Sequence, residues 1–141
     1  MPIQRSAIIL INEADEVALI RRDKPGETYY VFPGGGREAG ATLEETAIRE
    51  AHEELGVDVE LEGVAANVRF NGLDNPYYWA KMTGGIFGTG TGEEFEDLSS
   101  GYTPLWIKRE ELIHLPVRPT SLVQKLTKMT ERFYDIELID N

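Results

Sequence analysis

The sequence contains no cysteine, which excludes disulfide bonds, thiolate metal sites and a thiol nucleophile. It also has no apolar run near the ~20 residues that a membrane helix needs. Its start lacks the small-residue cleavage site of a signal peptide, so we expect a cytoplasmic protein with no membrane partner. Histidine is scarce, and His52 and His114 are isolated from each other, which argues against a histidine-based catalytic site.

Basic residues are also few. The chain has 14 lysines and arginines against 25 acidic residues, a net charge of −11. Binding to a nucleic-acid backbone needs basic surface, so we expect no nucleic-acid partner. A protein this acidic would repel a phosphate-bearing ligand unless cations enter with it. The alternative is that the acidic residues only keep the protein soluble.

The pattern of apolar residues predicts strands that alternate with helices in one domain spanning residues 1–141. Strands are expected at residues 6–12, 16–21, 29–32, 57–61 (with an extension toward 70), 77–83 and 103–108. The first two should form a hairpin, and residues 71–76 and 84–101 should be loops. This order indicates an α/β or α+β fold, with a mixed sheet flanked by helices.

Two helices are expected, at residues 43–55 and 119–133. In the first, Thr42 and Glu45 match the capping box, in which each side chain accepts a hydrogen bond from a free backbone N–H. Gly56 can adopt the left-handed conformation that ends a helix. The second helix shows its apolar residues at helical spacing, namely Leu122, Leu126, Met129 and Phe133.

Glutamates gather on one flank of the first helix. Glu50, Glu53 and Glu54 have the i, i+3 and i+4 spacings that make side chains neighbours. They lie beside the apolar arc that faces the core, where crowded carboxylates are unfavourable. A divalent cation would reverse that cost, since Mg²⁺ prefers carboxylate oxygens. The alternative is an ordinary solvated, glutamate-rich helix, in which Arg49 pairs with neighbouring acids.

The segment before this helix favours the metal site. Pro33 is followed by Gly34, Gly35 and Gly36, which let backbone approach the helix closely. Residues 35–57 resemble the Nudix hydrolase signature, G-x5-E-x7-R-E-U-x-E-E-x-G-U, where U is bulky and apolar. The matching residues are Gly35, Arg49, Glu50, Glu53, Glu54, Gly56 and Val57. The chain departs from the signature at Ala41, which replaces its first glutamate, and at the small Ala51.

The resemblance implies a Nudix-like α/β/α sandwich and hydrolysis of a phosphoanhydride bond in a nucleotide-like diphosphate, with Mg²⁺ as cofactor and Mn²⁺ as a possible substitute. It assigns catalysis to Glu50, Arg49 and Glu53. The implied metal ligands are Glu50, Glu53, Glu54, the Gly34 carbonyl and a carboxylate of a later loop, for which we select Glu94 over Glu93 and Glu96. In the family the first glutamate positions the arginine, so Glu38 or Glu45 is expected to replace it. Relatives often form homodimers, so a homodimer is expected too.

Substrate contacts are expected from Arg21, Arg22, Gly35 and Tyr30. The arginines end the second strand, where they can reach phosphates, although surface charges without a function are an alternative. Tyr29, Tyr30, Phe32 and Trp79 are candidates for stacking on a base, or else are core residues.

Other functions compete with hydrolysis. Gly34-x-Gly36-x-x-Ala39 formally fits a dinucleotide-binding fingerprint, but that fingerprint requires the helix to begin within the glycines. A nucleotide sensor on the same fold, without turnover, would account for Ala41. A structural domain that binds Mg²⁺ or Ca²⁺ would leave the glycines and Arg49 unexplained.

Overall fold

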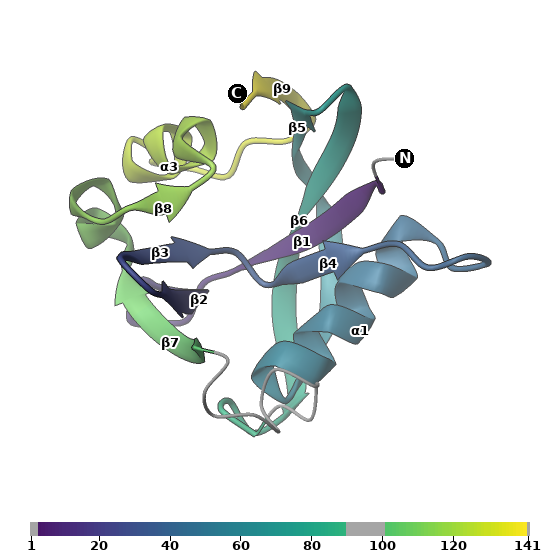
Figure 1. Cartoon of the computed structure of the whole chain (residues 1–141), viewed down its shortest axis with the longest axis horizontal. Coiled ribbons are helices and arrows are strands. Elements are labelled where there is room, and N and C mark those ends of the chain that lie inside the picture. The colour runs from purple at the N-terminus through teal and green to yellow at the C-terminus, as the bar shows by residue number, and fades with distance from the viewer. Residues whose placement is uncertain (1–2, 90–100, 141) are drawn as a thin grey trace.

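The computed structural model describes residues 3–89 and 101–140 as an α+β fold with two mixed sheets (Figure 1). The strands are β1 (Arg5–Leu10), β2 (Glu16–Lys24), β3 (Glu27–Val31), β4 (Gly34–Gly36), β5 (Val57–Phe70), β6 (Leu73–Gly85), β7 (Tyr102–Lys108), β8 (Val117–Arg118) and β9 (Ile136–Ile139). The helices are α1 (Leu43–Leu55), the 3₁₀ helix η2 (Arg109–His114) and α3 (Thr120–Thr127). One sheet has the order β4-β1-β6-β5-β9 and the other β7-β2-β3-β8. The α+β class expected from the sequence is confirmed.

Helices cover the sheets from two sides (Figure 1). Helix α1 buries Ala47, Ala51 and Leu55 against a cluster that includes Ile8 and Val57. On the other side, η2 and α3 bury Leu112, Leu122 and Leu126 in a cluster around Trp79. The sheets therefore have an apolar layer on each side, which holds α1 in a fixed position relative to both.

The predicted hairpin between the first two strands is wrong. Strand β1 pairs with β4 and, in parallel, with β6, whereas β2 pairs with β3 and β7. Among the described residues, the two segments are joined by a turn with hydrogen bonds between Asn12 and Glu16 and by one bridge between Ile11 and Val17, but β1 and β2 do not pair as strands. The reason is burial, because residues 7–10 and 17–20 are buried at every position, as is typical of strands in the centre of a sheet.

The C-terminal part also differs from the prediction. Helix α3 ends at Thr127 rather than near residue 133. Arg109 Nη1 donates to the carbonyls of Leu126 and Met129, at 2.7 and 3.1 Å, and Trp79 Nε1 donates to the Phe133 carbonyl at 2.7 Å. These bonds satisfy carbonyls that a longer helix would use itself. The chain then forms β9, a strand that was not predicted.

The segment after β5 is a tight turn rather than the longer loop expected. Asn71 and Gly72 have φ of 53° and 77°, as a two-residue hairpin turn requires. Asn75 and the following proline already belong to β6. Strands β5 and β6 thus form one long hairpin that begins directly after α1.

Candidate active site

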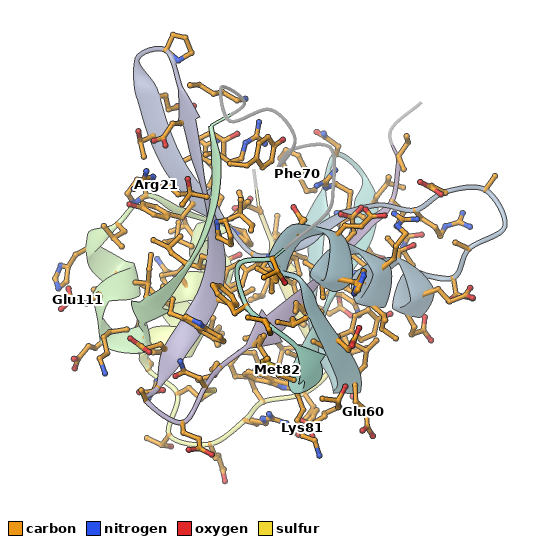
Figure 2. The ribbon with its side chains drawn as sticks, turned by 90° about the horizontal axis from the view of Figure 1, so that it is seen from below. Arg21, Glu60, Phe70, Lys81, Met82 and Glu111 are labelled. Carbon is orange, nitrogen blue, oxygen red and sulfur yellow. The ribbon has the colours of Figure 1, made fainter. Side chains whose placement is uncertain are left out.

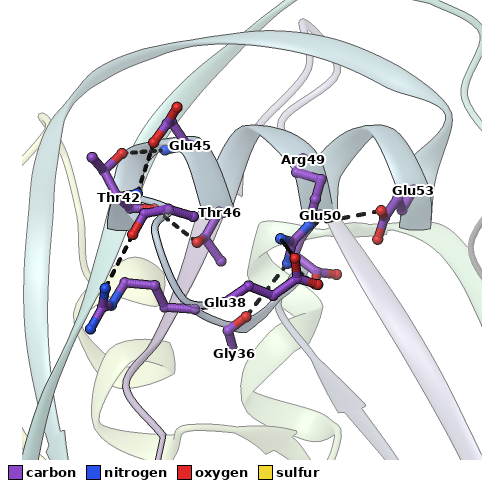
Figure 3. A network of polar contacts seen from close by, with 10 residues as sticks. Gly36, Glu38, Thr42, Glu45, Thr46, Arg49, Glu50 and Glu53 are labelled. Carbon is purple, nitrogen blue, oxygen red and sulfur yellow. Dashed lines mark hydrogen bonds and ion pairs between the residues drawn. The ribbon is translucent and has the colours of Figure 1, made fainter.

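The ends of α1 are fixed by local hydrogen bonds, as the sequence predicts. Thr42 Oγ1 accepts from the Glu45 N–H at 3.0 Å, and Glu45 Oε1 accepts from the Thr42 N–H at 2.8 Å (Figure 3). At the other end Gly56 has φ of 79° and donates to the His52 carbonyl. With both ends set, Glu50 and Glu54 of the helix lie against the glycine-rich segment 34–36.

Arg49 joins this helix to the loop before it (Figure 3). Its Nη1 lies 3.2 Å from Glu38, its Nη2 3.0 Å from Glu50, and its Nε 3.8 Å from Glu53. Burial lowers the pKa of Arg49, but Glu50, Glu38 and Glu53 raise that pKa by more, so it lies above its usual value. Arg49 therefore remains charged and orients the carboxylates around it.

The replacement for the missing signature glutamate can be located. Glu38 contacts Arg49, whereas the Glu45 carboxylate is engaged in the capping box. The hydrogen bond from the Thr42 N–H lowers the pKa of Glu45. Of the two candidates, the structure brings Glu38 to Arg49.

Glu54 and Glu50 lie against the backbone of β4. Glu54 is 6% exposed, and its Oε1 accepts from the Gly34 N–H at 2.7 Å. A Cβ on Gly35 would overlap the Glu50 carboxylate, and a Cβ on Gly34 would overlap the backbone of β1. Both positions need glycine because only glycine lets the strand pass this close.

The side chains expected to hold a cation point to protein partners in this arrangement. Within residues 3–89 and 101–140, no three acidic or histidine side chains converge on one point. Arg49 contacts both Glu50 and Glu53, while Glu54 contacts Gly34. The donors are nevertheless carboxylates and a backbone carbonyl, the hard oxygens that Mg²⁺ prefers, so their chemistry fits the ion. Glu93, Glu94 and Glu96 lie outside the described residues.

A cleft of about 630 Å³ lies beside these glutamates. Its polar lining residues include Glu50, Glu54, Gly35, Arg5, Arg22, Tyr29, Tyr102, Arg118 and Asp140. Arg22 and Gly35, two of the predicted substrate contacts, therefore line it. The other two do not: Arg21 pairs with Asp23 at 3.1 Å and projects from the β2–β3 hairpin (Figure 2), and Tyr30 packs on the core.

The difference between neighbouring residues follows from strand geometry, because side chains alternate between the two faces of a sheet. Arg22 lies opposite Tyr29 on β3 and Tyr102 on β7, so all three share one face. The alternation of side chains in the sequence could have indicated that Tyr29 and Tyr30 lie on opposite faces of the sheet. It could not indicate which of these faces lines the cleft. Nothing in the sequence pointed to Arg118.

Two other aromatic candidates are part of the core. Trp79 is 1% exposed, and Phe32 packs edge-on against Tyr77 with ring centroids 5.7 Å apart. Phe32 and Phe70 both line the cleft, but Phe70, labelled in Figure 2, is 45% exposed whereas Phe32 is buried. No helix among the described residues is both long enough and apolar enough to cross a membrane.

Comparisons with known proteins agree with the signature. The model of the NUDIX domain family matches residues 1–133. The Caenorhabditis elegans protein called nudix hydrolase 1 is 36% identical over 95 residues, which are 63% of this chain and 26% of that protein. The chain thus spans about a quarter of that relative's length.

Solved structures show the same fold. An ADP-ribose pyrophosphatase from Streptococcus suis superimposes with a TM-score of 0.70 at 16% identity, covering 97% of this chain and 99% of that one. A NUDIX hydrolase from Nitrosomonas europaea gives a TM-score of 0.73 at 15% identity, covering 95% and 93% of the two chains. The family match over residues 1–133, the signature on α1 and the shared fold show that this chain belongs to the NUDIX domain family.

Proposed function

We propose that the protein is a Nudix-type hydrolase that cleaves a phosphoanhydride bond in a small nucleotide-like substrate, with Mg²⁺ as cofactor and Mn²⁺ as a possible substitute. The observation that carries this proposal is the arrangement of Arg49, Glu50, Glu53 and Glu54 around glycine backbone at the edge of a cleft. The ADP-ribose pyrophosphatase among the structural neighbours supports the reaction class.

A divalent cation is used by Nudix hydrolases generally. Here Glu50, Glu53, Glu54 and the Gly34 carbonyl would hold it, together with Glu94 from the later loop. When bound, such an ion lowers the pKa of water and neutralises charge that develops on phosphate oxygens. It would also balance an acidic wall that otherwise repels the substrate.

The chain's own residues supply orientation and proton transfer. Glu50 lines the cleft and is placed to accept the proton of the attacking water, whose oxygen bonds to phosphorus as the bridging P–O bond breaks. Arg49 restricts the rotamers of Glu50 and Glu53, so little reorganisation is needed during reaction. Gly35 leaves room for the phosphate chain beside Glu50, where any other side chain would overlap the carboxylate.

The rival function is a nucleotide sensor without turnover. Its support in the sequence is Ala41, the position where the signature glutamate is absent. The contact between Arg49 and Glu38 supplies the arginine with another carboxylate partner. A sensor also has no need for three glutamates beside a nucleotide, so we favour the enzyme.

The test is product release from a panel of nucleoside triphosphates and diphosphate-linked nucleotides, with and without Mg²⁺. We expect activity that requires the metal and falls about 100-fold or more in Glu53→Gln, since ligands and their partners commonly cost this much. Glu60→Gln, which removes an exposed glutamate of β5 (Figure 2), is the matched control and should leave activity unchanged. Binding of a nucleotide without any hydrolysis would refute the enzyme and favour the sensor.

The oligomeric state and compartment stay predictions. We propose a homodimer, as in many relatives, and light scattering coupled to size exclusion tests it directly. The cytoplasmic localisation can be checked by cell fractionation.

A further inference from the structure

Arginines and tyrosines alternate along the cleft face of the sheet β7-β2-β3-β8. The Arg22 guanidinium carbon lies 3.8 Å from the centre of the Tyr102 ring and 5.9 Å from that of Tyr29. The Arg118 guanidinium carbon lies 3.9 Å from the Tyr29 ring centre. We call Tyr102, Arg22, Tyr29 and Arg118 the arginine–tyrosine row. All four line the cleft that also contains Glu50 and Glu54.

This packing decides which groups are open to a ligand. Tyr29 is 7% exposed and has guanidinium groups close to its ring, so it offers no open face to a base. Guanidinium groups stacked on rings keep their N–H groups at the edge, where they can bind an anion in a forked geometry. The Arg22 side chain forms no hydrogen bond or ion pair with the described part of the chain, and its Nε is buried. The row therefore favours an anion over a base.

The two walls of the cleft carry opposite charge. Glu50 and Glu54 belong to α1, while Arg22 and Arg118 belong to the sheet opposite. With Arg5 and Asp140 included, three arginines and three carboxylates line the cleft. A divalent cation at the glutamates would leave an excess of positive charge, which attracts an anion to the row.

Arg118 already has an acidic neighbour that an incoming anion would replace. Its Nη2 lies 3.2 Å from Glu27, and both side chains are 53% exposed. An exposed ion pair of this kind contributes little to stability, so Arg118 loses little free energy when it exchanges the Glu27 carboxylate for a phosphate. Asp140 also lines the cleft, where burial raises its pKa and the charge of Arg118 lowers that pKa by less.

We propose that Arg22 and Arg118 bind a phosphate group of the substrate that is not part of the cleaved anhydride. This inference rests on the proposed function and narrows the substrate to molecules with at least three phosphates. The extra phosphate is either the third member of a polyphosphate chain or a phosphomonoester elsewhere on the molecule.

Binding of inorganic probes tests the subsite without turnover. Calorimetry in Mg²⁺ would compare tripolyphosphate with pyrophosphate on Glu53→Gln protein and on the same protein carrying Arg22→Gln or Arg118→Gln. We expect each arginine variant to weaken tripolyphosphate about tenfold, as is typical of one charge-assisted contact, and pyrophosphate by less than about threefold. The matched control is Arg69→Gln, which removes an exposed arginine paired with Asp74 outside the cleft.

Equal weakening of both probes would overturn the proposal, because the row would then bind the cleaved phosphates. Unchanged tripolyphosphate binding would also overturn it. Arg118 is exposed, so Arg118→Gln decides the result if Arg22→Gln does not fold. If no substrate is hydrolysed but the arginine variants still lose tripolyphosphate, the proposed function fails and the anion subsite stands.

Kinetics then separate the two sources of the phosphate. Loss of kcat/KM for nucleoside triphosphates in Arg118→Gln assigns the row to the polyphosphate chain. Loss only for diphosphate-linked substrates with a phosphomonoester assigns it to that group. A loss that follows the identity of the base, whatever the number of phosphates, would overturn the proposal and make the row a base-recognition site.

Discussion

Glu38→Gln removes the carboxylate charge that faces Arg49 from the loop before α1. The side chain keeps its length, so the change isolates the ion pair at 3.2 Å. Arg49 would keep Glu50 and Glu53 but lose the contact that ties it to the loop. We expect slower turnover with little change in substrate affinity, because Arg49 acts by orienting the glutamates.

The size of the expected loss in kcat follows from how exposed the two paired side chains are. The Glu38 side chain is 75% exposed and that of Arg49 29%, so solvent screens the pair strongly. Two charges at this distance in a water-like dielectric interact by about 1 kcal/mol. Such a loss, if it falls entirely on the transition state, lowers kcat about fivefold. The effect should shrink as salt is added, since screening already weakens the pair.

The assay is steady-state hydrolysis by wild type, Glu38→Gln and Glu45→Gln at two salt concentrations. Glu45→Gln removes the charge from the capping box, although a glutamine can still accept the hydrogen bond from the Thr42 N–H, and it leaves Arg49 untouched. It should therefore lower the midpoint of thermal unfolding slightly and keep kcat. Ala41→Glu restores the residue that the signature expects and should rescue Glu38→Gln. Full kcat in Glu38→Gln, or a loss in Glu45→Gln instead, would refute this assignment.

Two further changes probe the packing around the site. Gly35→Ala places a methyl group on the Glu50 carboxylate and should reduce kcat about 100-fold by displacing that carboxylate. Gly36→Ala is the control, because its methyl group meets only the flexible Ile3 side chain. Equal kcat in the two variants would contradict this packing argument. A second prediction concerns stability at high pH. Burial raises the pKa of Tyr77 to about 12, while Arg5 lowers this pKa and Asp140 raises it, both to a smaller extent. The neutral phenol is favoured in the folded state, so this contribution to stability is complete below about pH 10 and is lost as the pH rises through about 12. Absorbance titration of tyrosine, followed alongside circular dichroism, checks this expectation, and a Tyr77 pKa near 10 in folded protein would contradict it.

Sequence reasoning was most accurate where structure is set by neighbours along the chain. Helix α1 was predicted with its observed bounds, because Thr42, Glu45 and Gly56 form its caps within a few residues. The position of the glutamates on that helix follows from its periodicity alone. The signature residues thus predicted a chemistry for the site before any tertiary contact was known.

Features that depend on distant partners could not be predicted in the same way. Whether Tyr29 or Tyr30 faces the cleft depends on a pairing register, and a shift of one residue exchanges them. Arg118 reaches the cleft from the short strand β8, whose parallel partner β3 is far away in the sequence. Glu45 lies one helical turn from Arg49 in sequence and Glu38 lies farther away, so sequence distance favours the wrong residue, and only the path of the loop brings Glu38 to Arg49.

The parallel strand pairs have a consequence for how the chain folds. Strand β1 aligns with β6, so that Ala7 faces Tyr77, and β5 aligns with β9, so that Ala66 faces Ile136. Each pair closes a loop of about 70 residues before it gains any stability, and closing such loops is slow. Neither sheet is complete until strands from the last third of the chain, β7, β8 and β9, have joined. Folding should therefore take milliseconds to seconds, and a nascent chain that stops before β9 leaves the edge of β5 open to other strands.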